Sequence, residues 1–147
     1  MSHTGDRSTA IHEQAGRTAM TTPAELERNA AAEIFGRVLT AMVTPFDEDG
    51  QVDEAGVEYL ARSLTASGWN DGVVVNGTTG ESISTTEAEK TLVIDAAVRA
   101  LAGTGRKVIA GVGSGDTHSS IQLARAAERA GADGLLVVAP YYSRPSQ

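Results

Sequence analysis

Cysteine is absent from the 147-residue sequence, and aromatic residues make up only 4% of it. Without cysteine the chain can form no disulfide, no thiolate zinc site and no cysteine nucleophile, and this composition fits a reducing cytoplasm. With so few aromatic rings, a core must be built from valine, leucine, isoleucine and alanine. That composition is typical of parallel sheets covered by helices.

Positive charge is also scarce, and the formal net charge is −7. Lysine and arginine do not cluster, which argues against a nucleic acid or an anionic membrane as partner. No apolar run approaches the roughly 20 residues of a membrane span. The N-terminus lacks the apolar stretch of a secretory signal. We therefore predict a cytoplasmic protein with no nucleic-acid partner and no membrane partner.

The sequence has only two lysines, Lys90 and Lys107. Lys90 falls inside a predicted helix, and Lys107 opens a predicted strand at the edge of the sheet opposite to the edge where active sites form. A covalent amine reaction at the strand ends would therefore need a lysine that this sequence does not contain. The histidines, His3, His12 and His118, lack metal-ligand spacing. We predict neither a metal site nor a cofactor.

The chain divides into three predicted parts. Residues 1–20 are polar and have no hydrophobic period, which predicts a disordered N-terminal extension. Residues 21–35 predict a short leading helix, because Thr22 can cap it and Pro23 suits the first helical position. From residue 36 to residue 147, strand and helix signals alternate.

Short apolar runs predict strands over residues 38–43, 72–76, 107–112 and 134–139. Helical spacing predicts three helices between them, the first capped by Asp53, the second opened by a capping box from Ser84 to Glu87, and the third ending before Gly131. This βαβαβαβ order indicates a parallel sheet with right-handed crossovers. On the pattern alone, an open doubly wound sheet and half of a (β/α)₈ barrel both remain open.

In both architectures, ligands bind at the carboxyl ends of the strands. The loop that follows the second strand there reads Gly77, Thr78, Thr79, Gly80 and Glu81. The glycines allow close approach of a ligand, and the threonine hydroxyls offer uncharged hydrogen bonds. Free backbone N–H groups near a helix start add to a site suited to a small carboxylate or keto acid. The alternative is a loop whose threonines only cap the backbone.

Two further loops at this edge invite functional interpretations. Tyr141 and Tyr142 follow the fourth strand, where a tyrosine can pass a proton or can pack in a subunit contact. The glycine-rich run from Gly111 to Asp116 follows the third strand. It departs from the dinucleotide fingerprint at Asp116, so we interpret it as a turn.

Taken together, these loops resemble the dihydrodipicolinate synthase family. The matching residues are Val43–Phe46 after the first strand, Gly77–Glu81 after the second and Pro140–Gln147 after the fourth, and Ile109–Gly113 matches the third strand. The resemblance begins near residue 35. It implies a TIM (β/α)₈ barrel of which only the first four strands and three helices are present.

The resemblance implies a class I aldolase-type lyase of lysine and diaminopimelate biosynthesis. In such an enzyme, pyruvate forms a Schiff base with a lysine, and the enamine attacks L-aspartate 4-semialdehyde to give 4-hydroxy-tetrahydrodipicolinate. On the family pattern, Thr78 belongs to a proton relay. Thr79 binds the pyruvate carboxylate, and Gly77 and Gly80 belong to the same substrate-binding loop. Tyr142 joins the relay of a neighbouring subunit, and Tyr141 lies at the dimer contact.

The family's Schiff-base lysine, its substrate-binding arginine and its second tyrosine all fall beyond Gln147. Since a complete barrel needs about 250 residues, we expect the 147-residue chain to be inactive alone. The full-length family member is expected to be a homo-oligomer, a dimer of dimers. The alternatives are an N-acetylneuraminate lyase-like or other pyruvate-dependent aldolase, and a non-catalytic α/β binding or interaction fragment.

Overall fold

A computed structural model describes residues 23–139 of the chain. The predicted extension over residues 1–20, Tyr141 and Tyr142 lie outside the described residues. The helices are α1 (Pro23–Phe35), α2 (Glu54–Ala66), α3 (Glu87–Leu101) and α4 (Thr117–Ala130), with a short 3₁₀ helix, η1 (Ser82–Ser84). The strands are β1 (Leu39–Ala41), β2 (Gly72–Val75), β3 (Lys107–Gly111) and β4 (Gly134–Leu136).

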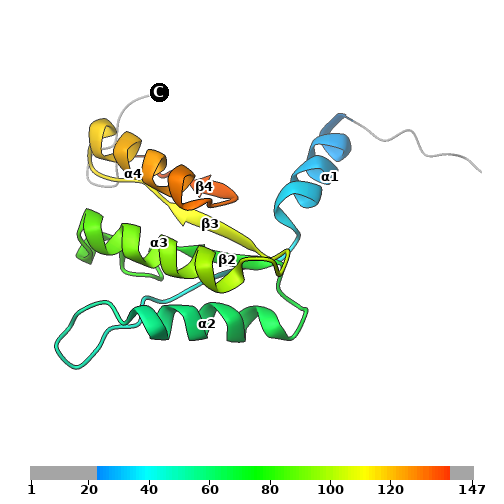
Figure 1. Ribbon diagram of the computed structural model, residues 1–147. Coiled ribbons are helices and arrows are strands. Elements are labelled where there is room, and N and C mark those ends of the chain that lie inside the picture. Colours follow the sequence, from blue (N-terminus) through cyan, green and yellow to red (C-terminus); the bar gives the residue numbers. More distant parts are fainter. Residues whose placement is uncertain (1–22, 140–147) are drawn as a thin grey trace, which may run out of the picture.

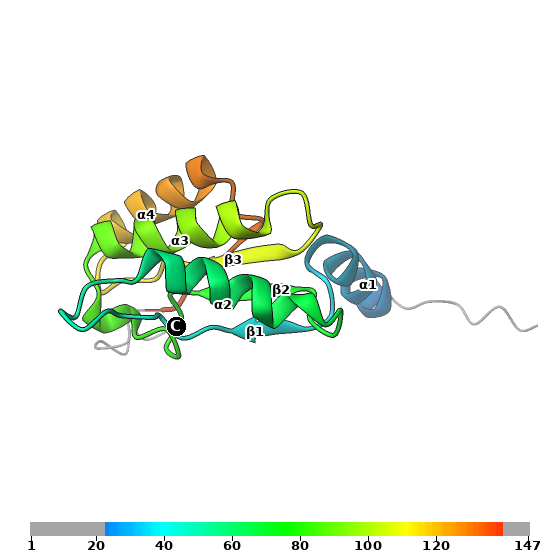
Figure 2. The ribbon, with the colours of Figure 1, turned by 60° about the horizontal axis from the view of Figure 1, so that its bottom comes forward.

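The four strands form one parallel sheet in the order β1-β2-β3-β4. Because consecutive strands are neighbours and crossovers are right-handed, α2, α3 and α4 all cover the same face of the sheet (Figures 1 and 2). A doubly wound sheet reverses its strand order and carries helices on both faces. The sheet is therefore part of an α/β barrel, as the resemblance implied.

The hydrophobic core lies between the sheet and this helix layer. Alternate residues of the two central strands point into it: Val73, Val75, Val108 and Ala110 are at most 2% exposed. The helix α3 meets them with the buried residues Val93, Ile94, Ala96 and Ala97. Small and branched aliphatic side chains fill this layer, as the low aromatic content predicted.

Local sequence signals explain where the helices begin. Asp53 Oδ1 accepts a hydrogen bond from the Gly56 N–H at 2.9 Å and caps α2, as predicted. The predicted capping box of α3 was placed two residues too early. Thr86 and Glu89 form the box, while Ser84 ends η1. The sequence carries the same serine/threonine-x-x-glutamate pattern twice, and the second copy is the one that caps α3.

Both outer strands are shorter than predicted. The strand β1 pairs only over Leu39–Ala41, and β4 only over Gly134–Leu136. Among residues 23–139, each pairs with a strand on one side only, so half as many neighbours hold it in extended form as hold β2 and β3. Four consecutive apolar side chains at the β4 edge, Leu135–Val138, are 46% to 66% exposed.

Asp71 anchors the start of β1 to the start of β2. Its Oδ2 accepts hydrogen bonds from the backbone N–H groups of Arg37 at 2.6 Å and Val38 at 2.9 Å. These two bonds, with the charge of Arg106, hold the pKa of the Asp71 carboxyl below its ordinary value of 3.8. The carboxylate is therefore favoured in the folded chain.

Asp71→Asn is expected to destabilise the chain at pH 7 and to have a smaller effect in acid. A depressed folded-state pKa contributes stability above the unfolded value, and that contribution is lost as the pH falls below about 4. Urea unfolding followed by circular dichroism at both pH values measures this difference. Asp95→Asn, on the exposed face of α3, is the control. An Asp71→Asn effect that persists unchanged in acid would contradict the assignment.

Candidate active site

The loop between β2 and η1 folds into consecutive tight turns. The Gly77 carbonyl accepts from the N–H groups of Gly80 at 3.1 Å and Ser82 at 3.3 Å, and the Thr78 carbonyl accepts from Glu81 N–H at 3.1 Å. These bonds turn the chain directly above the carboxyl end of β2. The predicted residues Gly77, Thr78, Thr79 and Gly80 therefore share one compact loop.

Two left-handed residues bracket this loop. Asn76 has φ 55° and Glu81 has φ 56°, and they are the only non-glycine residues with positive φ in the described range 23–139. This region is uncommon for non-glycine residues, although asparagine tolerates it better than most. Such conformations persist only where the surroundings hold them, and they cluster at functional sites.

Thr78 and Thr79 carry the loop's available hydrogen-bonding groups. Both residues are exposed. Among the described residues, no hydrogen bond engages either hydroxyl or either backbone N–H of this pair. The interpretation in which the threonines only cap the backbone therefore has no support within the described part of the chain. Two hydroxyls and two N–H groups form a small uncharged set of donors for an anion.

A cavity of about 440 Å³ opens beside this loop. It lies at the carboxyl ends of β2, β3 and β4, where sites of parallel α/β proteins gather. Its described walls combine polar loop residues with the apolar end of β4: they are Asn76, Gly77, Thr78, Ser82, Ile83, Gly111, Gly113, Leu136, Val137 and Val138. Thr79 and Gly80 are not among them. The volume suits a small organic ligand.

Neither Lys90 nor Lys107 lines this cavity. Lys90 lies in the first turn of α3, and its Nζ donates to the Thr85 carbonyl at 2.7 Å. Burial lowers the pKa of the Lys90 amine, while the charges of Glu87 and Glu89 oppose that shift. Lys90 is not among the lining residues. Its amine is instead hydrogen-bonded to a backbone carbonyl just before the start of α3.

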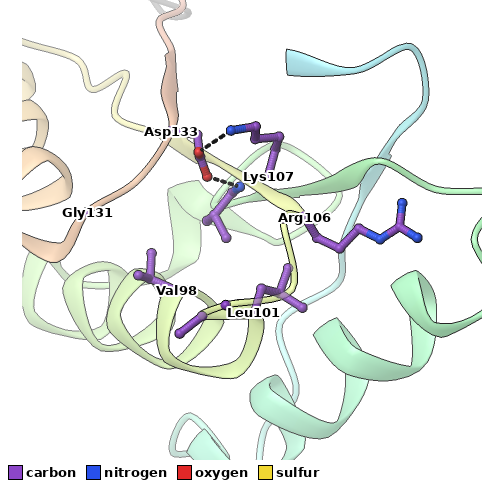
Figure 3. A pocket seen from close by; sticks show the side chains of 10 residues that line it. Val98, Leu101, Arg106, Lys107, Gly131 and Asp133 are labelled. Carbon is purple, nitrogen blue, oxygen red and sulfur yellow. Dashed lines mark hydrogen bonds and ion pairs between the residues drawn. The ribbon is translucent and has the colours of Figure 1, made fainter. Parts of the chain in front are cut away.

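Lys107 lies at the opposite end of the sheet, as predicted. Its Nζ lies 2.8 Å from Asp133 Oδ1, beside a smaller hollow of about 220 Å³ at the amino ends of the strands (Figure 3). Asp133 also accepts from the Val108 N–H at 2.9 Å, which joins the starts of β3 and β4. The ion pair gives Lys107 a structural role, because it helps to join the start of β3 to the residue before β4.

Sequence reasoning missed two residues that shape the loop. The Thr44 hydroxyl donates to the Gly80 carbonyl at 2.7 Å, and the Asn76 side-chain amide donates to the Lys90 carbonyl at 2.9 Å. Thr44 entered the sequence analysis only as part of the segment Val43–Phe46 that resembles the family, with no role of its own. A signal for Asn76 was its place between a valine strand and a glycine, where left-handed backbone is common.

A partial barrel of sequential parallel strands, with one helix layer and a cavity at the carboxyl edge that Thr78 and Ser82 help to line, defines a portion of a TIM-barrel enzyme. The model of the dihydrodipicolinate synthetase family matches residues 34–147 of the chain. The chain belongs to this family.

Named relatives and a solved structure agree with this assignment. A 4-hydroxy-tetrahydrodipicolinate synthase of Cutibacterium acnes is 56% identical over 117 residues, which cover 80% of this chain and 40% of the relative. The 4-hydroxy-tetrahydrodipicolinate synthase 2 of Streptomyces coelicolor is 57% identical over 113 residues, or 77% of this chain and 37% of the relative.

A crystal structure of the enzyme from Cyanidioschyzon merolae with lysine bound superposes with a TM-score of 0.73 at 43% identity. The superposition covers 77% of this chain and 38% of that one. The chain thus spans about two fifths of the length of the proteins it matches. In the described range 23–139, no helix is both long and apolar enough to cross a membrane.

Proposed function

We propose that this chain is the pyruvate-binding N-terminal portion of a 4-hydroxy-tetrahydrodipicolinate synthase. In the proposed reaction, pyruvate condenses with L-aspartate 4-semialdehyde in lysine and diaminopimelate biosynthesis. The observation that carries the proposal is a cavity at the carboxyl edge of the sheet that Thr78 lines, beside a loop whose Thr78 and Thr79 hydroxyls and N–H groups make no hydrogen bond to another residue of the described range 23–139. The identity of 56% and 57% to relatives named as this synthase supports it over an N-acetylneuraminate lyase.

The two threonines would divide the work on pyruvate. Thr78 lines the cavity, and its hydroxyl can pass a proton without placing a charge in a site that binds anions. Thr79 would hold the pyruvate carboxylate through its hydroxyl and N–H. The turns at Gly77 and Gly80 hold both threonines in one compact loop, in which Thr79 directly follows the cavity-lining Thr78. Tyr142 would complete the relay across a dimer contact that includes Tyr141.

The Schiff-base amine is proposed to come from a lysine outside residues 1–147. Lys90 and Lys107 are the only lysines of the sequence. One donates to the Thr85 carbonyl, and the other pairs with Asp133 at the far edge. A lysine must reach the cavity as a free amine to attack a ketone. The reaction therefore needs a second part of the barrel.

Exposed strand edges also support the proposal that a second part of the barrel completes this one. The strand β4 leaves Leu135 and Leu136 each 46% exposed, and β1 has no partner on its outer side among the described residues. Open edges with apolar side chains recruit further strands or aggregate. We propose that residues 36–147 form the first half of the barrel and that four further strands close it. An assembly as a dimer of dimers and a cytoplasmic location remain predictions.

A chimera tests this proposal. Residues 34–147 replace the matching segment of the Streptomyces coelicolor synthase 2, and product formation from pyruvate and aspartate semialdehyde is measured. We expect this Streptomyces chimera to be active and the 147-residue chain alone to be inactive, because only the chimera supplies the missing amine. A chimera that is soluble and unfolds cooperatively but makes no product would contradict the proposal, as would full activity of the isolated chain.

A further inference from the structure

A buried side chain from the end of β1, that of Thr44, hydrogen-bonds to the loop that carries Thr78 and Thr79. Thr44 lies just beyond β1, is 6% exposed, and donates its hydroxyl to the Gly80 carbonyl at 2.7 Å. The two residues are 36 positions apart in sequence. In the described part of the chain, no other side-chain hydrogen bond reaches residues 77–80.

Gly80 fits closely against the end of β1. A Cβ at this position would lie 3.1 Å from the Met42 carbonyl oxygen and 3.2 Å from Thr44 Oγ1. The inner side of the loop is therefore filled by β1, and Gly80 is buried while Thr78 and Thr79 are exposed. A hydroxyl donor on this inner side fixes how far the loop stands from the sheet.

Asn76 holds the other end of the loop. It is 4% exposed, adopts φ 55°, and donates its side-chain amide to the Lys90 carbonyl in the first turn of α3. Gly111 of β3 packs so closely that a Cβ there would lie 2.1 Å from the Asn76 carbonyl oxygen. The loop thus begins at a residue clamped between α3 and β3.

We propose that Thr44 is a positioning residue for the pyruvate-binding loop, with Asn76 as the second anchor. Thr44 acts through the Gly80 carbonyl and does not touch substrate. The inference rests on the proposed function and adds two residues that fix the position of the loop. A misplacement of about 1 Å in a catalytic group can lower a rate by about 100-fold, so an anchor on the loop governs the rate.

The test compares two buried threonines in the Streptomyces chimera. Thr44→Val and Thr65→Val each remove one buried hydroxyl that donates to a carbonyl, but Thr65 donates to Ala61 within α2, away from the loop. We expect Thr44→Val to lower kcat/KM for pyruvate about 10-fold to 100-fold. The KM for aspartate semialdehyde should stay unchanged, because the loop is proposed to bind pyruvate, which reacts with the lysine before the aldehyde is attacked. Thr65→Val should lower the thermal midpoint without this kinetic change.

Two further variants keep the test independent of folding. Thr44→Ser restores the hydroxyl and should recover most of kcat/KM. Asn76→Gly permits the left-handed backbone but removes the amide anchor, and it should lower kcat/KM for pyruvate as Thr44→Val does. An inactive unsubstituted chimera would refute the proposed function. An active chimera in which Thr44→Val resembles Thr65→Val, or in which serine fails to rescue, would refute the positioning role alone.

Discussion

Replacing Thr78 with valine in the Streptomyces chimera is expected to lower kcat by about 10²-fold to 10⁴-fold, the range of a lost general acid–base group. Valine keeps the shape of threonine but lacks the hydroxyl. Thr78 lines the cavity, and within the described residues its hydroxyl has no hydrogen-bond partner that would give it a structural role. The KM for pyruvate should change little, since the Thr78 hydroxyl is proposed to act on proton transfer.

Thr79→Val is the matched comparison, with a different kinetic signature. Its hydroxyl is proposed to bind the pyruvate carboxylate in the ground state as well as in the transition state. The loss of one hydrogen bond to a charged group should raise the KM for pyruvate by about 10-fold to 100-fold. Steady-state kinetics separate the two roles. Equal effects of both variants on the same kinetic parameter would contradict the separate roles of Thr78 and Thr79. Wild-type kinetics in both variants would show that the loop does not act on pyruvate.

Much of the fold could be predicted because its signals are local. Helix caps such as Asp53, valine runs such as that of β2, and the left-handed Gly131 at the end of α4 each act within a few residues. The same locality explains the error at α3, where two capping patterns overlap in sequence and the structure uses the second. The edge strands were overestimated because pairing depends on neighbours that are distant in sequence.

The location of the candidate site could also be predicted, but its internal geometry could not. The Gly-Thr-Thr-Gly sequence after a buried strand places the hydroxyls at the carboxyl edge. The bond from Thr44 to Gly80 joins residues 36 positions apart, and no periodicity encodes it. The left-handed Asn76 is likewise fixed by contacts with α3 and β3. These contacts appear only when distant elements meet.

The central claim is that the chemistry of the barrel is divided along the polypeptide. The described residues supply a cavity wall that includes Thr78 and Ser82, and they hold both lysine amines in other contacts, Lys90 with Thr85 and Lys107 with Asp133. A Schiff base forms only at an amine that is free and aimed at the ketone. The reacting lysine is therefore expected to be neither Lys90 nor Lys107.

Reductive trapping with pyruvate and sodium borohydride, followed by peptide mass spectrometry, tests this claim most directly. In the Streptomyces chimera we predict a pyruvate adduct on a lysine of the Streptomyces segment, and in the 147-residue chain alone we predict none. An adduct on Lys90 or Lys107 in either protein would contradict the account, because it would place the reactive amine within this chain.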